Sequence, residues 1–450
     1  MLLVVELMNY CGRRLMVGLV LLWIVPGCGK TRHPAPPAVT PIVLQTANGW
    51  SSAEPRIAMN PSGVAVAVWS QFDGTRWNVW SNRYLPGSGW QGPVLVEDDD
   101  LADASALRVA IDDAGCAFVS WYDSQGGYAY VNRSDASGAW PASPTLLASD
   151  SGQGIGMTDV AVSPGGIAVA VWFQKIGAHY QIWSRRYASP GGWAAAVRLD
   201  SMVAEDGADV SAAVDASGNA FAIWKQSDGV RWNAWVNRYT AGAGWGAATA
   251  LETESTGYAG LLSMAFDAAG NAMAIWQRET GTPGTPTRIR ARRYVAGVGW
   301  DASHVLLDDP AAGSASWCHL GFDGSGTAIA IWMQYDGSRT NGWSRRYVPG
   351  AGWTAPERFE NNGPNIFLPE LAVSADGSAV ATWASSTPAR SDAWASRYTP
   401  GGGWTAGSLL ESDDSGNVYD PHVGMDDSGR AIVVWVQVMN ALTTMLARPY

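Results

Sequence analysis

The sequence predicts an all-β fold, an eight-bladed β-propeller built from four-stranded blades. A phrase made of a polar turn ending in glycine, alternating small and branched apolar residues and then tryptophan occurs eight times, as in Asp215 to Trp224. The tryptophans that end the phrase, spaced by 51 to 56 residues, are Trp69, Trp121, Trp172, Trp224, Trp276, Trp332, Trp383 and Trp435. A repeat of this length with two-residue alternation is typical of a propeller blade, whereas a helical solenoid would show a helical period, which is absent here.

Each repeat is expected to contribute four strands, and the fourth copy shows them most clearly. An Asp-Ala-Ser-Gly turn, a Ser-Asp-Gly loop and a Gly-rich turn ending at Trp245 separate runs of alternating apolar residues. From the inner to the outer edge of the blade, the expected strands are 211–215, 219–226, 232–239 and 249–251. An acidic loop then leads to the next blade, and helix signals are nearly absent.

The two ends of the repeat region are incomplete in complementary ways. The last copy stops within its third strand, at Leu446 to Tyr450, and a strand-like segment from Pro41 to Thr46 precedes the first copy. If this segment supplies the outer strand of the eighth blade, the ring closes and loses its unpaired edges. Residues 41–450 would then form one propeller domain; separate smaller rings and an open array are the alternatives.

The first residues have the layout of an export signal. Arg13 and Arg14 precede an apolar run from Leu15 to Val25, which is too short to span a membrane. Val25-Pro26-Gly27-Cys28 resembles the bacterial lipobox, in which the cysteine is lipidated and becomes the new N-terminus. Residues 1–28 are therefore expected to be a signal peptide, with ordinary secretion or an uncleaved anchor as alternatives.

The resemblance to lipoproteins also implies a location. Cys28 would be the lipidation site, and Gly29 after it is similar to the pattern of lipoproteins released to the outer membrane, where the domain would face the periplasm or the exterior. Residues 29–40 are expected to be an extended Pro-rich tether. Contact with the membrane is expected only through the lipid, and the protein is expected to be a monomer.

Composition limits the classes of ligand. The formal net charge is −11, which argues against binding to a nucleic-acid backbone, where a basic stripe is expected. Cys116 and Cys318 fall four blades apart, so no structural disulfide is expected between them. The sequence contains no nucleophile motif, phosphate loop or zinc-helix motif, and neither a cofactor nor a metal site is predicted.

Residues that recur in every blade are expected to serve the blade itself. An arginine, usually followed by tyrosine, recurs in the expected third strand at Arg83, Arg133, Arg186, Arg238, Arg293, Arg346, Arg397 and Arg448. Sialidases are propellers in which arginines bind a sugar carboxylate, and the turns of these repeats resemble sialidase Asp-box turns. Eight arginines spread around a ring cannot converge on one ligand, however, so we expect each to form an ion pair or a stacking contact within its blade.

Residues that differ between blades carry the functional information. The expected inner strands share a small residue near the axis, at Ala58, Ala110, Ala161, Ala213, Ala265, Gly321, Ala372 and Gly424. Two positions earlier the residues are polar and unequal: Arg56, Arg108, Asp159, Ser211, Ser263, His319, Glu370 and His422. This ring should surround the mouth of the central funnel, where propellers bind ligands, although a solvated mouth without a ligand is the alternative.

The side chains of this ring suggest specific chemistry. A histidine, His319 or His422, near Glu370 could act as an acid and base pair, and Arg56 with Arg108 could hold an anion. Asp159 is a further acidic candidate.

Two loops on the same face add aromatic candidates. Trp77 and Trp232 have no aromatic counterpart in most other blades, so they could form platforms for sugar rings, with Asn78 and Asn233 as hydrogen-bond partners; local packing is the alternative. The acidic clusters at 97–100, 308–309 and 413–414 could hold Ca²⁺, but without regular ligand spacing they are expected to be solvated loops.

These observations favour a binding function. The leading hypothesis is a non-catalytic binding or scaffold lipoprotein of the bacterial envelope that engages a protein partner or a surface glycan; the architecture resembles eight-bladed lipoproteins that act as scaffolds in envelope assembly. The alternative is a glycan-active hydrolase or lyase, a sialidase-like propeller enzyme with its site at the funnel mouth. A purely structural surface protein is a third reading.

Overall fold

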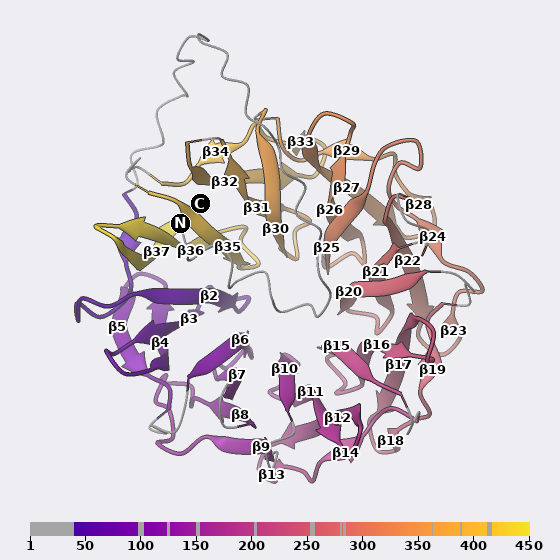
Figure 1. Ribbon diagram of the computed structural model, residues 1–450, viewed down its shortest axis with the longest axis horizontal. Coiled ribbons are helices and arrows are strands. Elements are labelled where there is room, and N and C mark those ends of the chain that lie inside the picture. Colours follow the sequence, from indigo (N-terminus) through magenta and orange to yellow (C-terminus); the bar gives the residue numbers. More distant parts are fainter. Residues whose placement is uncertain are drawn as a thin grey trace. The chain divides into compact units, whose positions relative to one another are not determined.

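The computed structural model describes residues 40–97, 103–123, 127–149, 154–201, 205–252, 257–279, 281, 285–361, 363–387, 389–411 and 416–450. The expected signal peptide, Cys28 and the tether up to residue 39 lie outside the described residues. The described part forms eight antiparallel sheets arranged in a ring, as predicted (Figure 1). Within it, no helix is long and apolar enough to cross a membrane.

Each blade starts with an inner strand, and the inner strands lie nearest the centre of the ring (Figure 1). The inner strands are β2 (Ser52–Met59), β6 (Ala104–Ile111), β10 (Ile155–Val162), β15 (Gly207–Val214), β20 (Tyr258–Phe266), β25 (Ala315–Phe322), β30 (Asn365–Val373) and β35 (Val418–Met425). The second strands are β3 (Ala65–Phe72), β7 (Ala117–Asp123), β11 (Ala168–Ile176), β16 (Ala220–Ser227), β21 (Ala272–Glu279), β26 (Ala328–Tyr335), β31 (Ala379–Ser386) and β36 (Ala431–Met439).

The third strands carry the repeated arginines toward the rim. They are β4 (Trp77–Leu85), β8 (Tyr128–Arg133), β12 (His179–Ala188), β17 (Trp232–Thr240), β22 (Arg288–Val295), β27 (Thr340–Val348), β32 (Ser391–Thr399) and β37 (Leu442–Pro449). In blades one and two the outer strand is continuous, as β5 (Gly89–Leu95) and β9 (Thr145–Ser149).

In blades three to seven the outer strand is split into two short pieces that both pair with the third strand. The pieces are β13 (Gly192–Trp193) and β14 (Val197–Arg198), β18 (Gly244–Trp245) and β19 (Thr249–Ala250), β23 (Gly299–Trp300) and β24 (Val305–Leu306), β28 (Gly352–Trp353) and β29 (Glu357–Arg358), and β33 (Gly403–Trp404) and β34 (Ser408–Leu409). The fourth blade thus contains the four strands expected from its sequence, with bounds shifted by a few residues.

The N-terminal strand closes the ring, as predicted. β1 (Ile42–Val43) pairs with β37, with Ile42 opposite Ala447 and Val43 opposite Leu446. The backbone N–H of Leu44 donates to the carbonyl of Met445 at 2.9 Å, and the Leu44 side chain is buried. The sheet of blade eight therefore contains both the first and the last strand of the described chain, and its inner strand β35 contacts β2 of blade one.

The repeated tryptophans form the centre of each blade. Trp69, Trp224 and Trp435 are fully buried, and their indole N–H groups need a partner because an unsatisfied buried donor is costly. The partner is a glutamine two residues later on the same strand face: Trp69 donates to Gln71 at 3.1 Å, and Trp224 to Gln226 at 2.9 Å. This Trp-x-Gln pairing explains a recurring glutamine to which the sequence analysis assigned no role.

Buried carboxylates tie the end of the outer strand to the third strand. The backbone N–H of Val79 donates to Glu97 at 3.1 Å, and that of Ile289 donates to Asp308 at 2.8 Å. Both acids are buried, so the expectation of solvated acidic loops is wrong for these two residues. Asp98 to Asp100 and the pair at 413–414 lie outside the described residues.

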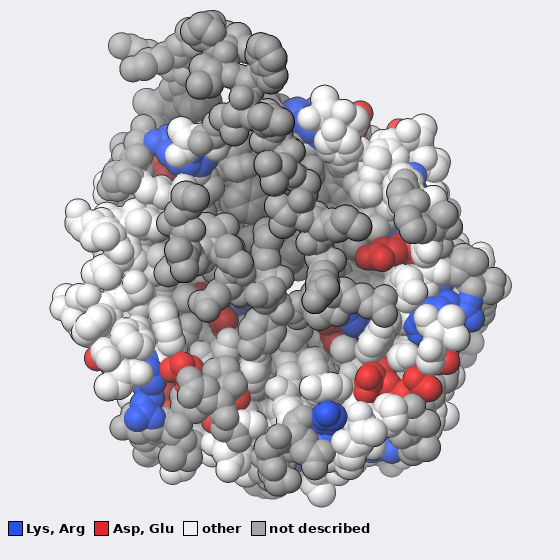
Figure 2. All heavy atoms as spheres, viewed as in Figure 1, with Lys and Arg blue, Asp and Glu red and all other residues white. Residues whose placement is uncertain are grey.

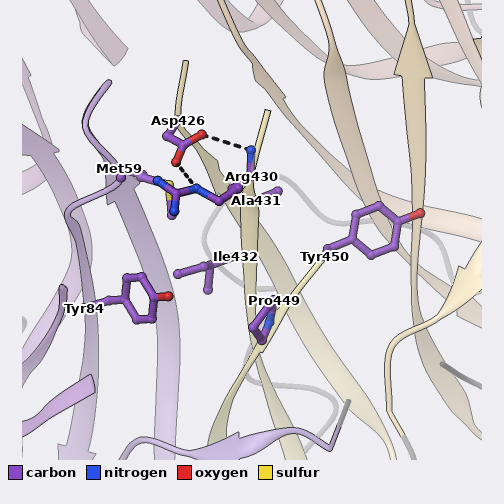
Figure 3. A pocket seen from close by; sticks show the side chains of 9 residues that line it. Met59, Tyr84, Asp426, Arg430, Ala431, Ile432, Pro449 and Tyr450 are labelled. Atoms are coloured by element: carbon purple, nitrogen blue, oxygen red, sulfur yellow. Dashed lines mark hydrogen bonds and ion pairs between the residues drawn. The ribbon is translucent and has the colours of Figure 1, made fainter. Parts of the chain in front are cut away.

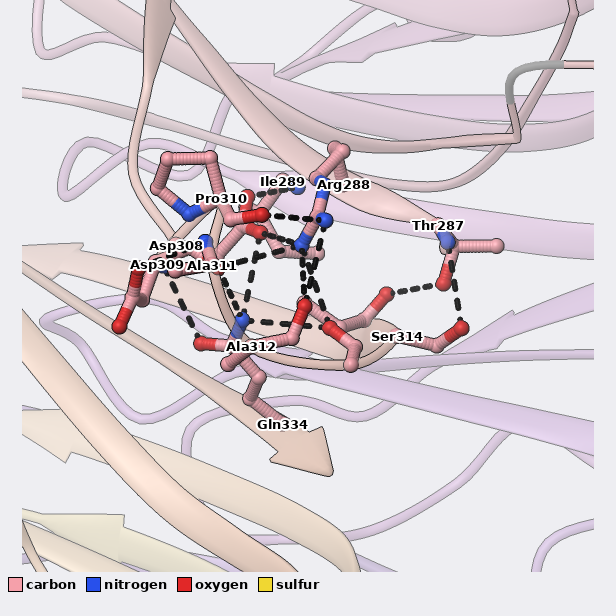
Figure 4. A network of polar contacts seen from close by, with 12 residues as sticks. Thr287, Arg288, Ile289, Asp308, Asp309, Pro310, Ala311, Ala312, Ser314 and Gln334 are labelled. Carbon is pink, nitrogen blue, oxygen red and sulfur yellow. Dashed lines mark hydrogen bonds and ion pairs between the residues drawn. The ribbon is translucent and has the colours of Figure 1, made fainter. Parts of the chain in front are cut away.

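The cation beside Asp308 belongs to the protein itself. Arg288 donates to the Asp308 carboxylate at 2.9 Å, and its two terminal nitrogens also donate to the carbonyls of Asp309 at 3.2 Å and Pro310 at 2.9 Å (Figure 4). Gln334 donates to the same Asp309 carbonyl at 2.7 Å. The loop after blade five is thus held by Arg288. This arginine binds the acidic segment 308–309, for which Ca²⁺ binding was an alternative.

The repeated arginines stack between blades, and some also make the expected contact within their own blade: Arg133 lies over Phe118 at 5.5 Å, and Arg346 Nε lies 3.7 Å from Glu357 Oε1. Arg186 in blade three lies over the ring of Tyr239 in blade four, at 5.1 Å from its centroid, and Arg346 lies over Tyr398 of the next blade at the same distance. The assignment of Arg448 to this set is wrong. In the strand register Pro449 pairs with Ile432 as Arg186 pairs with Val169, so Pro449 holds the arginine position in blade eight.

The small residues of the inner strands are required by close packing between blades. A side chain on Gly321 would meet Cγ2 of Val373 at 2.8 Å, and one on Gly424 would meet Cβ of Met59 at 3.1 Å. Both contacts come from the inner strand of the next blade. Crowding at the centre of the ring therefore accounts for the small residue that the inner strands share.

Candidate functional site

A bulge in each inner strand precedes the unequal polar ring. In β2 the pairing with β3 shifts between Ala53 and Arg56, and equivalent shifts occur in the other inner strands. A non-glycine residue with positive φ lies within the shift in seven blades of the described chain: Glu54, Ala106, Asp209, Leu261, Trp317, Leu368 and Asp420. Because a bulge re-aims the side chains that follow it, this local geometry sets the direction of the ring residues.

Four of the predicted residues form a continuous chain across blades six, seven, eight and one. Arg56 Nη1 lies 2.6 Å from His422 Nε2. His422 Nδ1 lies 3.5 Å from Glu370 Oε1, and His319 Nδ1 lies 3.6 Å from Glu370 Oε2. The carboxylate of Glu370 therefore lies between the two histidines, a contact that the sequence could not show.

The protonation of His422 follows from its neighbours. Burial, together with the charges of Arg56 and Arg108, lowers the pKa of His422 well below its ordinary value of 6.5. An arginine can only donate, so Nε2 of the neutral ring accepts from Arg56 and the proton resides on Nδ1, facing Glu370. The single lone pair of His422 is thus occupied by Arg56.

Arg108 and Asp159 extend the polar ring over blades two and three. Arg108 Nε lies 4.0 Å from Asp159 Oδ1, and burial together with the charge of Arg56 lowers the pKa of Arg108. The oxygens of Asp159 accept the backbone N–H groups of Val160 at 3.0 Å and Ala212 at 2.9 Å. Asp159 is therefore engaged in holding blade three to blade four.

The six residues Arg56, Arg108, Asp159, His319, Glu370 and His422, called the central cluster below, occupy consecutive blades from six through eight to three. Blades four and five carry only Ser211 and Ser263 at this position. The ring thus carries ionisable side chains over six blades and serines over two, so a ligand at the axis would meet an asymmetric surface. An asymmetric surface can fix the orientation of a bound molecule.

Trp77 and Trp232 are half-buried in separate local clusters. The ring of Trp77 lies 5.6 Å from that of Phe72, which in turn contacts Trp50. Lys225 Nζ lies 5.3 Å from the ring centroid of Trp232. Among the contacts of the described residues, none joins either tryptophan to the central cluster.

The asparagines expected beside these tryptophans have other partners. Asn78 donates to the Asp73 carboxylate at 2.9 Å, and Asn233 donates to Asp228 at 3.0 Å. Each amide thus stabilises the loop that precedes its strand. This geometry corresponds to the local-packing alternative for the amides.

An exposed aromatic residue near the central cluster was missed. Trp317, two residues before His319 on β25, is 39% exposed, and Leu261 at the equivalent position of blade five is 36% exposed. The sequence contains a signal for Trp317, because its type is unusual at this position. Equivalent residues in other blades include Glu54, Ala106, Asp209 and Asp420. Trp317 therefore gives β25 an exposed aromatic side chain that most other inner strands lack.

The surface charge, the possible metal ligands and the two cysteines limit the chemistry that the described residues can support. On the face drawn in Figure 2, basic and acidic side chains are interspersed over the described blades. Within the described ranges no group of three or more His, Cys, Asp or Glu residues is arranged to hold a metal ion. Cys116 and Cys318 are both buried and free, and burial raises the pKa of Cys318 to about 12.

Comparison with known proteins gives the fold and little more. No family model matches the chain, and no curated protein matches its sequence. Among solved structures, an ulvan lyase of polysaccharide lyase family PL25, bound to -[GlcA(1-4)Rha3S]-, is similar over 77% of this chain and 90% of its own, with a TM-score of 0.51 and 10% identity.

Two other solved structures act on or bind sugars. A leech intramolecular trans-sialidase covers 89% of this chain and 92% of its own, with a TM-score of 0.40 and 7% identity. A lectin from Aleuria aurantia, in complex with Fucalpha1-6GlcNAc, covers 70% and 96%, with a TM-score of 0.39 and 10% identity. At these identities the likeness concerns the propeller fold alone.

Proposed function

We propose that this protein binds an anionic glycan, one that carries carboxylate or sulfate groups, at the central cluster and does not chemically change it. The observation that carries the proposal is the chain from Arg56 through His422 and Glu370 to His319, flanked by Arg108. Arginine presents several donors in a fixed plane, which suits carboxylate and sulfate oxygens. The ulvan lyase with a similar fold holds a ligand of this charge class.

The geometry around His422 favours binding over catalysis. A general base needs a free lone pair directed at the proton that it removes. The lone pair of neutral His422 is taken by Arg56 at 2.6 Å. This candidate base is therefore engaged within the protein.

Trp317 supplies a second element of a sugar site. A pyranose ring presents an apolar face, and an exposed indole offers a flat surface for it. Trp317 is 39% exposed and lies two residues before His319 on β25, so it is the aromatic residue that we assign to the sugar ring.

The proposed setting is the bacterial envelope, with Cys28 as the lipid-bearing residue and a domain on the periplasmic or outer face of the outer membrane. The sequence of the leader supports this setting. Metabolic labelling with a fatty acid, compared between the native protein and Cys28→Ser, tests it. Equal labelling of the two proteins would contradict the lipoprotein assignment, and release of unlabelled native protein into the medium would indicate secretion.

A glycan array tests the binding proposal. The native protein should bind uronate-containing or sulfated glycans, and binding should weaken with added salt because the contacts are ionic. Arg56→Gln and Arg108→Gln should each weaken binding by roughly tenfold or more, since a hydrogen bond to a charged group contributes about 1.5–3 kcal/mol. Ser263→Ala, at the same ring position in blade five, is the matched control and should bind normally.

Two results would contradict the proposal: equal binding of neutral and anionic glycans, or normal binding by both arginine variants. If no glycan binds, crosslinking in intact envelopes tests an acidic protein partner in its place.

Glycan turnover is the second candidate function, and one contact favours it. Glu370 lies 3.6 Å from His319, and this pair could transfer a proton to or from a sugar. Incubation of the bound glycan with the protein, followed by analysis of the products, tests it. Turnover that His319→Gln abolishes and His422→Gln retains would establish an enzyme, whereas an unchanged glycan would leave the binding function.

A further inference from the structure

A pocket of about 280 Å³ lies between blade eight and blade one, where the ring closes. We call it the seam pocket. In Figure 3 the ring of Tyr84 lies on one side, Pro449 and Tyr450 lie on the other, and Ile432 lies between them. Gly63 also lines the pocket.

The repeat shows what fills this position elsewhere in the ring. Within the described chain, six interfaces place an arginine of one blade over a tyrosine of the next, at 5.1 to 5.6 Å from the ring centroid. The pairs are Arg133 with Tyr187, Arg186 with Tyr239, Arg238 with Tyr294, Arg293 with Tyr347, Arg346 with Tyr398 and Arg397 with Tyr450. This contact is thus the standard interface of the propeller.

The seam keeps the tyrosine and lacks the arginine. Tyr84 packs edge-on against Trp90 at 5.5 Å, as Tyr239 packs against Trp245 at 5.6 Å, so its ring is held as in the other blades. Pro449 occupies the arginine position, and the cation–π contacts of the described residues include none to Tyr84.

The neighbouring arginine does not replace it. Arg448 is buried between blades seven and eight. It donates to the carbonyls of Leu409 at 3.0 Å and Leu410 at 2.7 Å, both in blade seven.

The seam also keeps the turn that receives the arginine elsewhere. Arg83 donates to the carbonyl of Gly115 at 2.7 Å, and Arg397 donates to that of Gly429 at 2.6 Å. These glycines close the turn before the second strand of the next blade, and Gly63 closes the same turn in blade one. Nη2 of Arg430 lies 2.8 Å from the point where a side chain on Gly63 would begin, much as Nη2 of Arg186 lies 3.3 Å from that point on Gly218, so the turn of blade one already has a guanidinium beside it. A second guanidinium in the seam pocket would meet the aromatic face of Tyr84.

The charge at the rim of the pocket is already balanced. Arg430 donates through Nε to the Asp426 carboxylate at 2.8 Å, and its side chain is 62% exposed (Figure 3). The pair carries no net charge, so it does not exclude a second cation from the apolar floor. To admit a partner's guanidinium at the turn, the exposed side chain of Arg430 would have to swing outward from Gly63.

We propose that the seam pocket binds the arginine side chain of a partner polypeptide, which would complete the ring of arginine and tyrosine contacts. The volume is just under the range of about 300–1,000 Å³ that accommodates drug-sized ligands, so a single side chain fits better than a sugar chain. This site is separate from the central cluster and adds a protein partner to the proposed glycan function.

Ligand-observed NMR with short peptides tests the site. The purified protein is mixed with Gly-Arg-Gly, with the same peptide containing citrulline, which keeps the shape and lacks the charge, and with Gly-Lys-Gly. We expect the arginine peptide to bind, the lysine peptide to bind more weakly and the citrulline peptide not to bind. Tyr84→Leu, which keeps an apolar side chain but removes the aromatic face, should weaken arginine binding by roughly tenfold.

Restoring the repeat gives the most direct variant. Pro449→Arg should place an internal guanidinium over Tyr84, which abolishes peptide binding and raises the thermal midpoint. Tyr239→Leu, at an interface that is already filled, should lower the thermal midpoint and leave peptide binding unchanged. Glu370→Gln, in the central cluster, should also leave it unchanged, which separates this site from the glycan site.

Three results would overturn the proposal. They are equal binding of the arginine and citrulline peptides, arginine binding that survives Tyr84→Leu, and the absence of any arginine-dependent signal from the native protein. The first two would assign the signal to another surface, and the third would mean that the seam pocket stays empty.

Discussion

The guanidinium carbon of Arg186 lies 5.1 Å from the ring centroid of Tyr239, and the two residues belong to neighbouring blades. The same relationship recurs around the ring, so the blades are joined by cation–π contacts as well as by apolar packing. Each such contact lies between sheets that share no hydrogen-bonded strand. The contacts therefore contribute to the stability of the ring rather than to that of a single blade.

Removing one of these contacts should destabilise the protein modestly. Arg186→Met keeps an unbranched side chain but removes the charge, and we expect a loss of about 0.5–2 kcal/mol in the free energy of unfolding. Urea denaturation of Arg186→Met, Tyr239→Leu and the double variant measures the coupling between the two residues. Additive effects in this cycle would show that the pair does not interact.

The glutamine that accepts a hydrogen bond from a core tryptophan should contribute to the stability of the fold. Gln226→Leu leaves the buried indole N–H of Trp224 without its acceptor and removes a donor to the carbonyl of Glu205, 3.1 Å away. We expect a loss of about 1–3 kcal/mol in the free energy of unfolding. Blade seven has Ser385 at this position, and its buried hydroxyl has no hydrogen-bond partner among the described residues, so Ser385→Ala is the control and should destabilise the protein far less.

Glu411 should make stability depend on pH near neutrality. Burial raises the pKa of Glu411 to about 8 in the folded chain, from an ordinary value of 4.5. Between these values the folded state binds more protons than the unfolded state, so stability should fall as pH rises from about 5 to 8.

Glu411→Gln mimics the protonated form of the side chain and should reduce the dependence of stability on pH. Thermal unfolding of both proteins across that pH range measures the difference. Parallel curves would exclude Glu411 as the source of the dependence.

Closure of the ring by β1 should be visible in hydrogen exchange. Leu44→Ala removes a buried side chain beside the β1 and β37 pair, and large-to-small core changes of this kind cost about 2–5 kcal/mol. We expect faster amide exchange in β37 and a lower thermal midpoint. Ile42→Ala, at a residue that is 47% exposed, should have little effect on either. Similar exchange in both variants would contradict closure through this strand.

The sequence predicted the architecture because the information is local and repeated. Turn glycines and two-residue alternation define each strand, and the incomplete last copy indicated the role of the segment at 41–46. The error at Arg448 has a physical cause. Residue type suggested that the arginine before Tyr450 belonged to the repeated set, but the register counted from Trp435 and Leu446 places Pro449 there.

The candidate site was predictable as a position and not as a set of contacts. Symmetry identified the ring of Arg56, Glu370 and His422, because unequal residues at equivalent positions stand out. The distances between them depend on the bulge that re-aims each side chain and on contacts between blades. For example, the backbone N–H of Ala212 donates to Asp159 of the preceding blade. A single repeat cannot show this contact, because it joins two repeats.

The position of β1 also bears on how the chain is made. Among the strands of the ring, β1 is synthesised before all others and its partner β37 after all others, so Leu44 cannot be covered until β37 has been made. Nascent or prematurely terminated chains would expose Leu44 and an open sheet edge, the kind of surface that chaperones and proteases recognise. Pairing between the first and last strands thus makes closure of the ring the final step of its assembly during synthesis.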